Sequence, residues 1–467
     1  MTSRTTPPAS PSGAPAPTPA GRRPVRRLTS RGRAEAHRVA SPLELFFDLC
    51  FVVAIAQAGV QLVHSLAESH VGEGLLSYAM VFFAIWWAWM NFTWFASAYD
   101  NDDVLYRIVT LVQVAGVLVL AAGVSRAFQE HEFLAVWLGY AIMRVAMSSQ
   151  WLRVALSTEG AERTAALRYA VGVLVCQVGW VGLLILPEGG RIGLFLAMAV
   201  VEMCVPLYAE KDRATSWHPH HIAERYGLFT IIVLGETIAA ATVAVKSGID
   251  ENDALGELLP IAVGGLLIVF AAWWIYFVVP IHGHLRTSGQ AFLWGYGHYF
   301  VFASAAAIGA GLEVAVEQAT GEAHLSTTAA SSAVTLPTAL FLSTVWVLHA
   351  RHFKVGLAQQ SVLPVTALLV ICCTFLGEWA VLAAGLVAAL AVATGTTLTA
   401  RTPAREPRKA GQSEASREGV EAQESREATD GRGAPGGAAP EDQEAPDGEA
   451  PEDREAPDGE ASGRRGS

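Results

Sequence analysis

The sequence is poor in charged residues and lacks the short motifs that soluble enzymes carry. Only 16% of its 467 residues are charged and 52% are hydrophobic, whereas about a quarter of the residues in a soluble domain are charged. No Walker A, G-x-S-x-G, H-E-x-x-H or dinucleotide-binding motif stands in a suitable context. We therefore expect neither soluble-enzyme chemistry nor a nucleic-acid partner.

Cysteine is also scarce, and its placement indicates no redox or metal site. All five cysteines lie inside apolar blocks, and none belongs to a C-x-x-C motif. We expect them to be small buried apolar side chains, and we expect no cofactor.

Long apolar blocks dominate the chain. They are about twenty residues long, enough for a helix rising 1.5 Å per residue to cross a hydrocarbon core of about 30 Å. The fold class is therefore an all-α integral membrane protein with about 12 transmembrane helices. Since one span is short and the break at "GEW" is weak, 10 or 11 helices stay open. The expected spans are 45–64, 75–97, 104–124, 133–151, 167–186, 192–208, 226–245, 258–280, 291–311, 329–349, 362–376 and 379–398.

Composition divides the chain into three parts. Residues 1–40 are rich in Pro and carry eight arginines against one acid, and residues 401–467 are rich in Gly, Pro and acid. Both have too little apolar surface to offset the entropy of ordering, so we expect a disordered arm, a membrane domain over residues 41–400 and a disordered tail.

Basic residues predict the orientation, because they are enriched in cytoplasmic loops. With twelve spans and a cytoplasmic N-terminus, the outer loops hold only Arg126, Arg191 and Lys246. Both termini are then cytoplasmic. The inner loops and their edges hold Arg107, Arg153, Arg163, Arg168, Lys211, Arg213, Arg225, Arg286, Arg351 and Lys354.

Two pairs of similar stretches suggest an internal duplication. "ELFFDLCFVVAIAQ" opens the first span and "ERYGLFTIIVLGET" opens the seventh, while Trp86–Trp87 and Trp273–Trp274 mark the spans that follow. Matching features six spans apart favour two parallel six-helix halves. The alternative is that any two apolar helices show such likeness.

At these stretches the sequence resembles the bacterial low temperature requirement protein A family. "SPLELFFDLCFVVAIAQ", "WWAWMNFTWFASAYDNDDVLYR", "ERYGLFTIIVLGETI" and "WGYGHYFVFASAAAIGAGLE" carry the resemblance, which covers most of the membrane region. It implies a polytopic protein of the bacterial cytoplasmic membrane, and it implies fold and location more firmly than activity.

Three charged residues are predicted to share the bilayer midplane. Counting about 1.5 Å per residue from the span ends places Glu236, Glu202 and Arg144 at one depth. Charges at this depth are costly, so they are candidates for a pathway for a proton, an ion or a polar solute. Arg144 neutralises one acid, and we predict that Glu236, next to Gly235, is the acid that exchanges a proton. The alternative is a buried structural ion pair.

A second polar layer lies nearer the cytoplasm. Asp48 and His298 stand a turn or more inside their helices and are further pathway candidates, with Arg144 and His298 as counter-charges. Glu44 shares a helix face with Asp48. The secondary candidates are Glu44, Asp100, Asp103, Arg107 and Glu224, and for the first four helix capping is the alternative.

The loop "HPHHIAER" is the one candidate metal site. His218, His220, His221 and Glu224 could be ligands, but their spacing fits no standard signature. An ordinary histidine-containing loop is the favoured interpretation, so no metal is expected.

Three functions follow from these patterns. The leading hypothesis is a membrane protein that moves, or responds to, a proton, an ion or a small polar solute. The alternatives are a membrane-embedded enzyme that modifies lipid or isoprenoid, and a non-catalytic factor for growth in the cold. The lipid bilayer is the one expected partner, and the sequence leaves the solute and the oligomeric state open.

Overall fold

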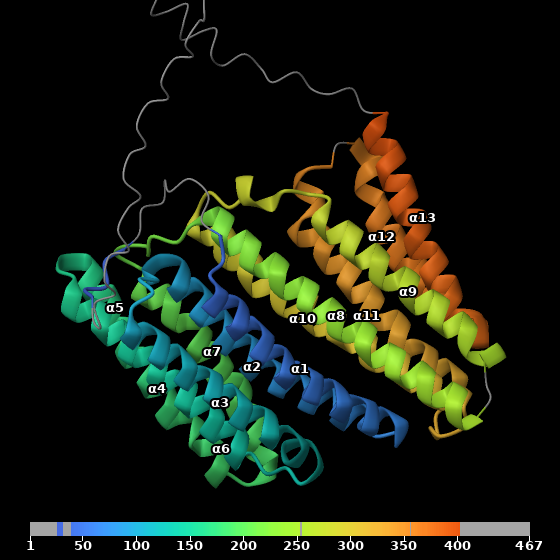
Figure 1. The fold of residues 1–467 in the computed structure, drawn as a ribbon, viewed down its shortest axis with the longest axis horizontal. Coiled ribbons are helices and arrows are strands. Elements are labelled where there is room, and N and C mark those ends of the chain that lie inside the picture. Colours follow the sequence, from blue (N-terminus) through green and yellow to red (C-terminus); the bar gives the residue numbers. More distant parts are fainter. Residues whose placement is uncertain (1–25, 31–38, 253–254, 355, 402–467) are drawn as a thin grey trace, which may run out of the picture. The chain divides into compact units, whose positions relative to one another are not determined.

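The computed structural model describes residues 26–30, 39–252, 255–354 and 356–401, and their regular structure is helical (Figure 1). The arm and tail expected to be disordered lie largely outside these residues. The α-helices are α1 (Pro42–Ala67), α2 (Val71–Tyr99), α3 (Val104–Gln129), α4 (Leu134–Ser157), α5 (Gly160–Trp180), α6 (Gly182–Ile185), α7 (Glu188–Ala209), α8 (Pro219–Asn252), α9 (Leu255–Phe277), α10 (Ser288–Ala319), α11 (Thr327–Leu348), α12 (Gly356–Cys373) and α13 (Ala380–Ala400). Three short 3₁₀ helices are η1 (Ile281–Gly283), η2 (Ala350–His352) and η3 (Thr374–Trp379).

Local sequence signals set where the helices begin. Ser41 caps α1 in a reciprocal capping box with Glu44, and Pro42 occupies the first turn, where a missing N–H costs nothing. Thr287 and Gln290 form the same box at α10. The short polar stretches between apolar blocks therefore determine the helix starts.

Ten helical segments among the described residues are long and apolar enough to cross a membrane. They exclude α4, which carries Arg144 and Arg153, and they count 356–401 once. Within that last segment Gly377 has a φ of 62° and interrupts the helix between α12 and α13. Many large apolar side chains on these helices are exposed in the isolated chain, as expected of lipid-facing surfaces. The protein is a multi-pass helical membrane protein.

The helix α1 joins the first part of the bundle to the second. It packs against α2 and α3 on one side and against α8 and α10 on the other (Figure 1). Glycine allows close crossings elsewhere: a Cβ at Gly139 would meet the backbone of Gly116 and Leu120, and one at Gly311 would meet the backbone of Ala333. These crossings fix α3 on α4 and α10 on α11.

The two tryptophan pairs occupy different environments. Trp86 and Trp87 are buried, and both rings lie against Tyr296 of α10. Trp273 and Trp274 are 47% and 46% exposed. The pairs that suggested a duplication therefore do not share an environment.

Part of the N-terminal arm and two cysteines depart from expectation. Leu28 is fully buried, its N–H donates to Ser157, and the N–H of Arg26 donates to Asp103 at 2.7 Å. Residues 26–30 are thus packed against the helix ends, although we expected the whole arm to be disordered. Cys204 and Cys372 are exposed, so the prediction that all five cysteines are buried was wrong.

Candidate functional site

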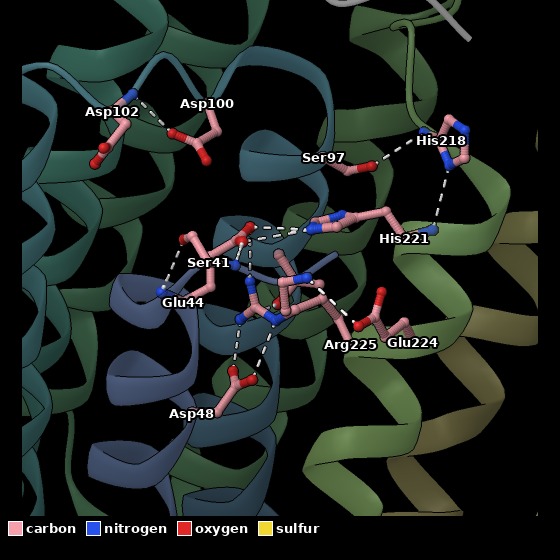
Figure 2. Close-up of polar contacts among 12 residues, drawn as sticks. Ser41, Glu44, Asp48, Ser97, Asp100, Asp102, His218, His221, Glu224 and Arg225 are labelled. Carbon is pink, nitrogen blue, oxygen red and sulfur yellow. Dashed lines mark hydrogen bonds and ion pairs between the residues drawn. The ribbon is translucent and has the colours of Figure 1, made fainter. Parts of the chain in front are cut away.

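The first turns of α1 and α8 form a buried charged cluster, which we define as Glu44, Asp48, His221 and Arg225 (Figure 2). Arg225 Nη1 lies 3.0 Å from Glu44 Oε1, and Nη2 lies 2.5 Å from Asp48 Oδ1. A second contact joins Arg225 Nε to Asp48 Oδ2 at 3.1 Å. His221 Nε2 lies 3.2 Å from Glu44 Oε1. None of the four side chains is more than 1% exposed.

Neutral donors complete the cluster. The indole N–H of Trp89 donates to Asp48 Oδ1 at 2.7 Å, and the backbone N–H of Ser41 donates to Glu44 Oε2 at 2.7 Å. The two carboxylates stand four residues apart on α1, as the helical spacing predicted, and one guanidinium spans both. The planar guanidinium of an arginine has enough N–H donors to contact both carboxylates at once, whereas the single ammonium group of a lysine does not.

The charges of the cluster balance only when it holds one further proton, on His221 or on a carboxyl group. Arg225 is permanently cationic, so it offsets one of the two carboxylates. The second is offset only if His221 is protonated or if one carboxyl is neutral. The arrangement therefore has one proton whose presence decides the net charge of the cluster.

The sequence analysis found half of this cluster. Glu44 and Asp48 were candidates, but Arg225 was counted as a loop charge and His221 was assigned to a loop that could bind metal. The signal was present: Arg225 follows Glu224 at the start of an apolar helix, and His221 lies four residues before it. Only the packing of α8 on α1 shows which carboxylates they meet.

A second ion pair lies between α4 and α7. Arg144 Nη2 lies 2.7 Å from Glu202 Oε1, and both side chains are almost fully buried. Tyr140 Oη and Trp180 Nε1 donate to Glu202 Oε2 at 2.7 and 2.9 Å. The common depth deduced for Arg144 and Glu202 thus corresponds to a contact. This pair has one charge of each sign and needs no further proton.

Glu236 is not part of that pair. It is half-buried on α8, and within the described part of the chain no hydrogen bond or ion pair joins it to Arg144 or Glu202. The helix α8 packs against α1, α9 and α10, whereas α4 and α7 both pack on α5. The predicted triad was therefore wrong, because equal depth does not make two helices neighbours.

The environment of Glu236 also differs from the prediction. Gly235 is exposed, and a Cβ there would meet no atom within 4 Å, so no neighbouring helix packs closely against this glycine. Glu236 instead lies on the same face of α8 as Arg225, about three turns further along. It is the next carboxylate on that face.

His298 is buried but does not serve as a counter-charge. Its Nδ1 donates to the carbonyl oxygen of Trp294 at 2.7 Å, and its Nε2 lies 3.0 Å from Tyr276 Oη. Both ring nitrogens therefore have neutral partners, and no carboxylate is among its partners in the described residues. The predicted role beside Asp48 or Glu202 was wrong.

The aspartates after α2 cap helix ends and form ion pairs. Asp103 accepts the N–H of Tyr106 at 2.7 Å and pairs with Arg153, while Asp102 pairs with Arg107 at 2.6 Å. Asp100 accepts the N–H of Asp102 at 2.9 Å. This geometry is the capping alternative rather than a pathway.

The histidine loop leads into the start of α8, and its residues make different contacts. His218 Nδ1 accepts the N–H of His221 at 3.3 Å, so it caps the helix. His220 lies with its ring centre 5.4 Å from that of His282, and Glu224 Oε1 accepts the N–H of Ala40 at 3.5 Å. Across the described residues, no group of three or more His, Cys, Asp or Glu side chains is arranged to hold a metal ion.

Comparisons with known proteins found a relative and a family model. An uncharacterized protein of Rhizobium meliloti (strain 1021) is 28% identical over 279 residues, which cover 56% of this chain and 65% of that protein. No solved structure matches the chain. The family model described as bacterial low temperature requirement A protein (LtrA) matches residues 39–397. The chain therefore belongs to the bacterial low temperature requirement A family.

Proposed function

We propose that this protein moves a proton, an ion or a small polar solute across the bacterial cytoplasmic membrane. The observation that carries the proposal is the excess of one carboxylate over the guanidinium in the buried cluster of Glu44, Asp48, His221 and Arg225. A buried site whose net charge depends on one proton binds and releases that proton when its surroundings change.

The proposed topology has twelve crossings with both termini in the cytoplasm. It adds α4 to the ten candidate spans and divides 356–401 at Gly377. The support is the distribution of basic residues, which leaves few on the outside. In this topology α1 and α8 both enter from the cytoplasm, so the cluster lies near the cytoplasmic surface.

Aromatic rings lie beyond the cluster toward the outside. Phe51 follows Asp48 by about one turn on α1, and it is fully buried. The Trp89 and Phe229 rings stack with their centres 4.3 Å apart between α2 and α8. They separate the cluster from Glu236, which we propose as the next carboxylate of the pathway. A proton then enters from the cytoplasm and passes outward only when these rings move.

The ion pair of Arg144 and Glu202 has a structural role in this proposal. Its charges balance, and Tyr140 and Trp180 supply hydrogen bonds to Glu202. Such a pair holds α4 on α7 and gives no free proton-binding capacity. Pathway residues are therefore in the cluster and at Glu236.

We also propose that the chain consists of two halves of six spans each, α1 to α7, in which α5 and α6 form one span, and α8 to α13. The packing order supports this: α1 contacts α2 and α3 as α8 contacts α9 and α10. The helix pairs α3–α4 and α10–α11, α4–α5 and α11–α12, and α5–α7 and α12–α13 continue the correspondence. Gly123 meets Ala135 and Val136 where Gly311 meets Ala333 and Val334.

Flux measurements on the reconstituted protein test the proposed function. Proteoliposomes with trapped indicators for protons, sodium and potassium, or with a radiolabelled neutral solute, would be challenged with the corresponding gradients. We expect flux with at least one gradient, loss of that flux in Asp48→Asn and His221→Gln, and no change in Glu159→Gln, whose side chain is exposed. Absence of flux under every gradient, or unchanged flux in folded His221→Gln, would overturn the proposal.

A further inference from the structure

A cavity with a mostly apolar lining and a few polar side chains lies on the face of α8 that points away from the charged cluster. It has a volume of about 340 Å³ and is bounded by the start of α8, the end of α9, η1 and the end of α11. This is within the range of about 300–1,000 Å³ found for small-molecule pockets. Its polar lining residues are His220, Glu224, Tyr276, His282 and His349.

One buried polar atom in this lining makes no hydrogen bond to the described part of the chain. It is Glu224 Oε2. Figure 2 shows Glu224 beside Arg225 but outside the charged cluster, and its other oxygen accepts the N–H of Ala40 at 3.5 Å. Buried polar atoms are nearly always paired, so an unpaired carboxylate oxygen beside a cavity indicates a hydrogen-bond donor in that cavity.

The charged and aromatic residues of the lining indicate the charge of the ligand. Glu224 is the one carboxylate, and no lysine or arginine lines the cavity in the described part of the chain. The rings of Tyr276 and Phe277 form part of the wall, and aromatic faces attract cations. The lining therefore favours a small cation with hydrogen-bond donors over an anion.

His349 is held by contacts within the protein. Its Nε2 accepts the indole N–H of Trp294 at 3.1 Å, so a neutral ring carries its proton on Nδ1. The ring also hydrogen-bonds to the backbone of Tyr276. The remaining walls, which include Leu228, Val279 and Ile281, suit a short alkyl segment.

We propose that this cavity binds a small protonated amine, with the ammonium group on Glu224. The inference extends the proposed function by naming a class of solute, and it rests on that function only for the step from binding to movement. His220 and Glu224 line the cavity, and each directly precedes a residue of the charged cluster, His221 or Arg225. A molecule bound in the cavity therefore contacts the helix that supplies these two cluster residues.

Binding to the purified full-length protein in lipid nanodiscs tests this inference. Ethanolamine, which is cationic at neutral pH and carries a hydroxyl, would be titrated while the melting temperature is followed by tryptophan fluorescence. We expect a saturable rise, an affinity at least tenfold weaker in Glu224→Gln and an unchanged affinity in Glu159→Gln. Ethylene glycol, which lacks the amine, should give no saturable shift.

Further variants separate folding and flux from binding. His282 is exposed, so His282→Gln should fold normally and bind ethanolamine several-fold more weakly. His221→Gln should lose proton-coupled flux but keep ethanolamine binding, so that failure of the proposed flux and failure of the cavity are distinguishable. Unchanged ethanolamine affinity in both Glu224→Gln and His282→Gln, no saturable shift in the unmodified protein, or a shift with Zn²⁺ but not with the amine would overturn the inference.

Discussion

The guanidinium of Arg225 on α8 meets the carboxylate of Asp48 on α1 through two contacts, Nε to Oδ2 at 3.1 Å and Nη2 to Oδ1 at 2.5 Å. Both side chains are fully buried, and the contact links helices that are far apart in the sequence. We expect Arg225→Ala to strand two carboxylates and to destabilise the protein by about 3–5 kcal/mol.

Arg225→Lys tests the geometry of this contact separately from its charge. Lysine keeps the charge but cannot span both carboxylates, so we expect an intermediate loss of stability and impaired flux. Melting temperatures in detergent and proton flux in proteoliposomes would show this. Full stability and flux in Arg225→Lys would mean that charge alone is sufficient.

For the ion pair of Arg144 and Glu202 we expect that breaking the pair lowers the stability of the protein and that the pair is not needed for flux. Glu202→Gln leaves the buried Arg144 without its anion, and we expect a loss of about 3–5 kcal/mol. The double variant Arg144→Met with Glu202→Gln should regain most of that loss and retain flux. Unfolding measured for the single and double variants checks this, and a double variant that is stable but inactive would contradict the structural role.

For Glu236 we expect the opposite result, a loss of flux without a loss of stability. It is half-buried with no ion-pair partner in the described residues, so Glu236→Gln should leave the melting temperature nearly unchanged. If it is the next carboxylate of the pathway, proton-coupled flux should be lost, because the amide cannot release a proton. Full flux in this variant would remove Glu236 from the pathway.

Asp103 predicts a pH-dependent contribution to stability. Burial alone would raise the pKa of Asp103, but hydrogen bonds from Arg153 and from the N–H groups of Tyr106 and Arg26 hold it below its ordinary value. The ionised form is thus favoured by folding, so its stabilising effect is complete above about pH 4, the usual pKa of aspartate, and is lost as pH falls through the lower folded value.

The matched variant for this effect is Asp103→Asn. Asparagine still caps α3 but cannot pair with Arg153. The difference in melting temperature between the unmodified protein and the variant should be constant from pH 7 to 5 and should shrink below about pH 4. A difference that stays constant to pH 3 would show that the charge of Asp103 does not matter.

The proposed topology predicts the side on which each loop lies. Reporters fused at Gly72, Pro187 and Asp250 should be outside, and one at Ala161 should be inside, because basic residues concentrate in the inner loops. Enzymatic reporters active on one side only would measure this. An inside signal at Asp250 would contradict the topology of the second half.

The sequence by itself determined the membrane class, the positions of the helices and the family. Apolar blocks of about twenty residues and capping residues such as Ser41 and Thr287 are local signals, and they needed no knowledge of the packing. Depth along each helix was also local, since it follows from the rise per residue, and it identified Arg144 and Glu202 as a pair at one level.

Only the tertiary structure decided which helices are neighbours. Glu236 shares a depth with Arg144, but α8 packs on α1 and not on α4, so its predicted pairing failed. The same packing brings Arg225 and His221, which looked like loop residues, onto Glu44 and Asp48. Depth is set by counting along one helix, whereas adjacency is set by side-chain packing around the whole bundle, and no single helix sequence contains that information.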